Sequence, residues 1–86
     1  MARFEKLLNR FLSKPKDFTF KEMKQLLGKL GYREIKSGAT SGSRIVFFHE
    51  GIRHIIRIHK PHPRNTIKRY QLDFVEEELK RREILR

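Results

Sequence analysis

The sequence predicts an α+β domain in which a three-stranded antiparallel sheet carries two helices on one face. Three observations lead to this prediction. A capped amphipathic helix precedes three short segments with strand character, a turn joins the last two of these segments, and another amphipathic helix closes the chain. One further amphipathic helix stands at the N-terminus.

The N-terminal helix is predicted from an apolar stripe with helical spacing. The stripe consists of Phe4, Leu7, Leu8, Phe11 and Leu12. Pro15 ends the pattern, because proline cannot continue a helix and disfavours helix in the residue before it. We expect residues 1–16 to form a helical extension that packs on a single domain formed by residues 17–86. Alternatively, the stripe holds a partner chain.

The second helix is predicted from its capping signal. Thr19 and Glu22 have the spacing of a capping box, and Phe18 and Met23 that of a hydrophobic staple. Gly31 follows at the usual C-terminal stop. The residues expected to be buried are Phe20, Met23, Leu26, Leu27 and Leu30.

Strands are predicted at residues 32–36, 44–49 and 52–60, with a small loop at Gly38–Ser43. Glu50 and Gly51 predict a tight turn in which the glycine supplies a positive φ. Alternation in the third strand divides it into two faces. We expect His54, Ile56, Ile58 and Lys60 to face the core, and Arg53, Ile55, Arg57 and His59 to face solvent.

The closing helix is expected from about Tyr70 to about Arg82. Leu72, Val75 and Leu79 form its apolar stripe, with Phe74 beside them. Its acidic residues offset its basic ones, so the basic excess of the chain lies upstream.

Charge indicates the kind of partner. The 86 residues have a formal net charge of +11, which indicates an anionic binding partner: a nucleic acid, an acidic protein or a membrane surface. The chain has no cysteine and no run of about 20 apolar residues, so we expect a soluble cytoplasmic protein. A membrane role is disfavoured because the basic residues lie on a strand and a turn.

Positive charge concentrates in Gly51–Leu72, which contains no acidic residue and three of the four histidines. We interpret this segment as the face that meets a nucleic acid; a solvated strand edge and loop is the alternative. His59 and His62 are candidates for proton transfer with a ribose 2′-hydroxyl, or for simple hydrogen bonding to phosphate. The intervening proline argues against a metal-ligand pair. His49 is expected to be exposed and inert, and His54 to be structural.

Residues 18–82 resemble the HicA family of toxins, the small ribonuclease partners of HicB antitoxins. The resemblance rests on Leu30-Gly31-Tyr32, on the loop that ends in Gly42-Ser43, on the turn His59-Lys60-Pro61-His62-Pro63, and on Lys68-Arg69-Tyr70-Gln71. It implies a double-stranded-RNA-binding-like α-β-β-β-α fold, metal-independent cleavage of mRNA that blocks translation, and a HicB-like antitoxin as partner. No cofactor is implied.

One position departs from the family pattern. The usual catalytic histidine directly follows Gly-Ser, and Arg44 stands there in this chain. Arginine stays protonated in proteins and cannot act as a general base. Proton transfer is therefore assigned to His59, with His62 in reserve, unless the chain is a non-catalytic RNA- or DNA-binding module or a basic protein-interaction module. The expected RNA-binding residues are Ser43, Arg44, Arg53, Arg57, Lys60, Arg64 and Lys68.

Overall fold

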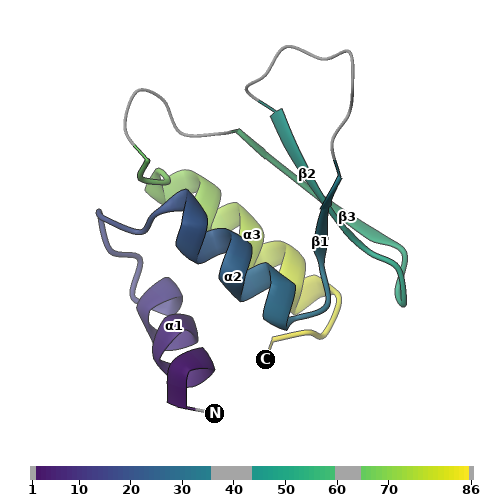
Figure 1. Cartoon of the computed structure of the whole chain (residues 1–86), viewed down its shortest axis with the longest axis horizontal. Coiled ribbons are helices and arrows are strands. Elements are labelled where there is room, and N and C mark those ends of the chain that lie inside the picture. Colours follow the sequence, from purple (N-terminus) through teal and green to yellow (C-terminus); the bar gives the residue numbers. More distant parts are fainter. Residues whose placement is uncertain (1, 36–43, 60–64, 86) are drawn as a thin grey trace.

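The computed structural model describes residues 2–35, 44–59 and 65–85. Its elements are α1 (Ala2–Leu12), α2 (Phe20–Lys29), β1 (Arg33–Ile35), β2 (Arg44–His49), β3 (His54–His59) and α3 (Arg69–Arg81). The strands form one antiparallel sheet in the order β1-β2-β3. Helices α2 and α3 lie together on one side of this sheet, and α1 lies beyond them (Figure 1). The predicted α+β fold with an extra N-terminal helix is confirmed.

The core fills the space between the sheet and the two helices. From the sheet, Phe47, Ile56 and Ile58 are at most 2% exposed. The predicted stripes of both helices are buried against them, namely Met23, Leu26 and Leu27 of α2 and Leu72, Val75 and Leu79 of α3. Phe20 and Leu30 are only partly buried. No helix in residues 2–35, 44–59 or 65–85 combines the length and the apolar character needed to cross a membrane.

The capping signal of α2 has the predicted effect. The Thr19 hydroxyl accepts a hydrogen bond from the Glu22 amide at 3.1 Å, and the Glu22 carboxylate accepts one from the Thr19 amide at 2.9 Å. After the helix, Gly31 adopts φ +100°, and a Cβ there would lie 2.6 Å from His49 Nε2. The positive φ and the lack of room for a Cβ both require glycine at this position after α2.

A short backbone bridge ties the beginnings of α2 and α3 together. Thr19 and Thr66 form an isolated antiparallel bridge. The Phe20 amide donates to Asn65 O at 2.8 Å, and the Ile67 amide donates to Phe18 O at 2.7 Å. The two helices therefore start side by side, although the whole sheet separates them in the sequence.

The hairpin between β2 and β3 differs from the prediction. Residues 50–53 all lie in the turn, and β3 begins only at His54. The positive φ, +51°, belongs to Arg53 and not to Gly51. The prediction of a tight two-residue turn was therefore wrong. The chain uses a longer turn, and its last residue, Arg53, adopts the left-handed conformation. Lys60, predicted as the last residue of this strand, lies outside the described residues.

Helix α1 packs on the rest of the chain through its predicted stripe, except for Leu12, which is exposed. Two ion-paired cations add to this packing, Arg10 in the helix and Lys14 just after it. Phe11 is fully buried, and its ring centroid lies 5.8 Å from that of Phe18. Arg10 Nε donates to Glu22 Oε2 at 2.6 Å, and Lys14 forms an ion pair with Glu76. The expected packing of α1 is thus observed, while the division into an extension and a domain stays a prediction.

These two ion pairs predict that α1 loosens in acid. The hydrogen bond from Arg10 lowers the pKa of Glu22 below 4.5, and the hydrogen bond from Lys14 does the same for Glu76. A lowered folded-state pKa gives stability that is complete above the unfolded value and is lost as the pH falls through the folded value. Between about pH 6 and about pH 3, the melting temperature should therefore fall less in a Glu22→Gln/Glu76→Gln variant than in the wild type.

Glu83→Gln serves as the control, because Glu83 is exposed and forms no ion pair among the described residues. It should keep the full pH dependence of the wild type. Equal pH dependence in all three proteins would show that these carboxylates do not hold α1.

Candidate nucleic-acid interface

The outer face of the sheet, which α2 and α3 leave uncovered, combines basic and apolar side chains. Register places three pairs directly opposite one another, Arg44 with His59, Val46 with Arg57 and Phe48 with Ile55. Directly opposite residues of a ladder share a face. Since Phe47, Ile56 and Ile58 are buried on the inner face, these pairs lie on the outer one. This face also includes Arg33 and Ile35 of β1.

Arg44 and His59 are held together at the open end of the β2–β3 ladder. The Gln71 side chain of α3 accepts from the His59 amide at 2.6 Å and donates to His59 O at 3.2 Å. Both backbone groups of His59 therefore point away from β2. A pair of this non-hydrogen-bonded kind has Cα atoms about 4.5 Å apart, the closer of the two spacings in an antiparallel ladder. An arginine and an imidazole thus stand next to each other in solvent.

The charged side chains around this pair are basic. Arg44, Arg57 and His59 are exposed, and none of them forms an ion pair with a carboxylate within the part of the chain that the structure describes. The carboxylate nearest in register on β1, Glu34, faces the helices and pairs with Lys24 at 3.1 Å. Such an arrangement can hold a phosphate by its cations while the imidazole of His59 exchanges protons beside it.

The structure brings together only part of the predicted site. Arg44, Arg57 and His59 share the outer face, and Lys68 stands at the start of α3 as its N-cap residue. Arg53 lies at the opposite end of β3, in the hairpin turn, so its predicted place beside Arg57 and His59 is wrong. The remaining expected residues fall outside the described part of the chain: Ser43, Lys60, His62 and Arg64.

The other two histidines are structural. His54 is 3% exposed; its Nδ1 lies 2.6 Å from the Tyr32 hydroxyl and its Nε2 lies 2.9 Å from Glu78 Oε1. The expectation of a satisfied core histidine is confirmed. His49 is not exposed as expected, because its ring is half-buried and packs edge-on against Tyr32 at 5.0 Å. Burial raises the pKa of Tyr32, which keeps its hydroxyl available as a donor to His54.

Gln71 is the functional residue that the sequence prediction missed. It is 6% exposed and is one of two buried polar residues among those described. The signal was present in the spacing, since residues 71, 75 and 79 fall on one helical stripe. A glutamine on an otherwise apolar stripe needs hydrogen-bond partners in the core, and the edge of β3 supplies them.

Gln71→Leu is expected to free the end of β3. The change leaves the amide and carbonyl of His59 without their partners, at a cost of about 1–3 kcal/mol. Hydrogen exchange at the His59 amide should accelerate, while the amide of Ile56 in the middle of the strand should stay protected. Gln25→Leu on the exposed side of α2 is the matched control. An equally protected His59 amide in the Gln71 variant would contradict the assigned role.

The fold and this face define a class: a small, strongly basic α+β domain with a sheet face that its helices leave uncovered. A family model described as "HicA toxin of bacterial toxin-antitoxin" matches residues 20–80. The chain belongs to the HicA toxin family. Neither the search of curated proteins nor the search of solved structures found a match.

Proposed function

We propose that this chain is the toxin of a type II toxin–antitoxin pair that binds mRNA and cleaves it without a metal ion, thereby blocking translation. Membership of the HicA family supports the toxin role. The observation that supports RNA cleavage is the cross-strand pair of Arg44 and His59 on the exposed basic face. A HicB-like antitoxin would be the protein partner, and covering this face would silence the toxin.

In the proposed reaction, a phosphodiester of RNA lies against Arg44 and Arg57. His59 removes the proton of the adjacent 2′-hydroxyl, and the 2′-oxygen attacks the phosphorus. The bond from phosphorus to the 5′-oxygen breaks, and that oxygen takes a proton from a second acid, for which His62 is the candidate. The products are a 2′,3′-cyclic phosphate and a 5′-hydroxyl end. Arg44 and Arg57 stabilise the charge that develops on the phosphoryl oxygens.

Purified protein incubated with RNA in the presence of a chelator tests the proposal. We expect products with 2′,3′-cyclic phosphate ends, and no cleavage of an RNA whose target nucleotide lacks the 2′-hydroxyl. Persistence of intact RNA under these conditions would refute the cleavage step.

A non-catalytic RNA-binding module is the second candidate, and one observation favours it. By the family resemblance, the usual catalytic histidine is expected directly after Gly42-Ser43, where this chain has Arg44, whose guanidinium binds phosphate without exchanging protons. This candidate predicts salt-dependent RNA binding, with a log–log slope of about −0.7 for each phosphate neutralised on a single strand, and no products. A basic module that binds only an acidic protein would show no RNA affinity at all.

A further inference from the structure

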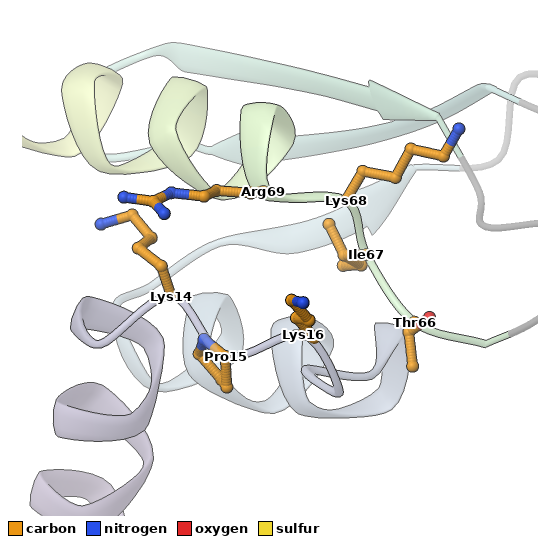
Figure 2. Close-up of a pocket in the computed structure, with 7 residues that line it drawn as sticks. All are labelled: Lys14, Pro15, Lys16, Thr66, Ile67, Lys68 and Arg69. Atoms are coloured by element: carbon orange, nitrogen blue, oxygen red, sulfur yellow. The ribbon is translucent and has the colours of Figure 1, made fainter.

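A pocket of about 280 Å³ lies away from the sheet, between the α1–α2 linker and the start of α3. Its lining residues are Lys14, Pro15, Lys16, Thr66, Ile67, Lys68 and Arg69 (Figure 2). This volume far exceeds the ~30 Å³ share of one water molecule. Four of the lining residues are cations, and they come from two segments that the Thr19–Thr66 bridge holds side by side.

The charge in and around the pocket is not fully balanced. Lys14 pairs with Glu76 and lies 3.8 Å from Asp73, and Arg69 lies 4.0 Å from the same Asp73. Four cations against these two carboxylates leave a net charge of +2. Lys16 and Lys68 are exposed and form no ion pair with a carboxylate of the described residues. Lys14 and Arg69 extend to the same side in Figure 2, and both approach Asp73, whereas Lys68 extends to the opposite side.

The backbone adds to this field. Helix α3 begins at the pocket without a side-chain cap, and its first turn contains no acidic residue. The first amides of a helix have no partner within the helix, and its positive end favours an anion. A tetrahedral anion with several acceptor oxygens would neutralise the cations at this positive helix end.

We propose that this pocket binds a phosphate group, with Lys16 and Arg69 as its ligands, Lys14 as a fixed neighbouring charge and Lys68 at its rim. Gln71, in the first turn of the same helix, bonds the backbone of His59, so the pocket and the Arg44–His59 pair lie at the same end of α3. An RNA strand cleaved at His59 is one source of the phosphate, and this part of the inference rests on the proposed function. A free phosphate ion or phosphomonoester is the other source. In either case, the N-terminal segment supplies part of the site.

The test uses inorganic phosphate and the full chain. Phosphate should shift the amide resonances of Ile67, Lys68 and Arg69 in the wild type, and these shifts should be lost in a Lys16→Gln/Arg69→Gln variant. The matched control is Lys21→Gln/Lys29→Gln, which removes the same charge from exposed positions of α2. No shift in the wild type, or equal loss in both variants, would overturn the site.

Binding of a labelled single-stranded RNA then identifies the source. If the phosphate belongs to RNA, the pocket variant should bind about three- to tenfold more weakly than the control, with a log–log salt slope lower by about 1. Equal RNA affinity in both variants, with the phosphate response intact in the control, identifies free phosphate instead. A wild type that responds to phosphate but binds no RNA would refute the proposed function and leave the pocket in place.

Discussion

His59→Ala is expected to lower the rate of RNA cleavage by about 10²- to 10⁴-fold, the usual contribution of a positioned general acid or base. The ring of His59 is exposed, and its place in the sheet is held through backbone bonds to Gln71. Its removal should therefore leave the fold intact and change RNA affinity only slightly. Arg44→Ala should show the opposite pattern, with weaker binding as the first effect.

The measurement is a single-turnover cleavage rate with an RNA-binding assay on the same preparations. His59→Gln is the informative companion, because glutamine keeps a hydrogen-bonding side chain that does not titrate near neutral pH. If His59 only hydrogen-bonds phosphate, the glutamine variant should retain most of the activity. Wild-type rates in both variants would remove His59 from the mechanism and direct attention to His62.

His54→Leu is expected to produce the largest loss of stability among single substitutions outside the apolar core. The variant leaves the Tyr32 hydroxyl buried without its partner and removes the hydrogen bond to Glu78. Burying a polar group without a partner costs about 1–3 kcal/mol, so loss of this chain should cost about 2–4 kcal/mol. For a domain of this size, that corresponds to a fall in melting temperature of roughly 10 °C or more.

The melting temperatures of the His54→Leu and His49→Leu variants, each compared with the wild type, test this expectation. The His49 ring is half-buried, and its one described hydrogen bond, from the Ile52 amide, is long at 3.4 Å. We expect the His49 variant to lose less than about 1 kcal/mol. Equal losses would mean that the hydrogen-bonded chain through His54 adds nothing beyond the packing of an imidazole ring.

Local patterns were enough to predict most of the framework. The apolar stripe that Pro15 ends defines α1, and the box of Thr19 and Glu22 fixes the start of α2. Strand alternation placed Ile56 and Ile58 in the core and Arg57 and His59 outside, as the structure shows. These features depend on near neighbours in the chain, and near neighbours are what periodicity detects.

The features that the sequence did not predict depend on contacts between distant segments. Gln71 has its role only because α3 begins beside the end of β3. Ile67 and Thr66 pair with the segment before α2, which no local pattern indicates. The positive φ at Arg53 reflects the length of the turn, and a glycine nearby suggested a shorter one.

The Thr19–Thr66 bridge has a consequence for how the molecule opens. The first residue of α2 donates to the segment before α3, and Ile67 in that segment donates to the segment before α2, so the starts of the two helices are tied together. They should therefore behave as one cooperative unit with the sheet, exchanging amide hydrogens only through global unfolding. Helix α1 lies outside this unit and is joined to it by Phe11, by partly buried apolar side chains and by the ion pairs of Arg10 and Lys14. It is the part of the chain that can undock and redock while the remainder stays folded.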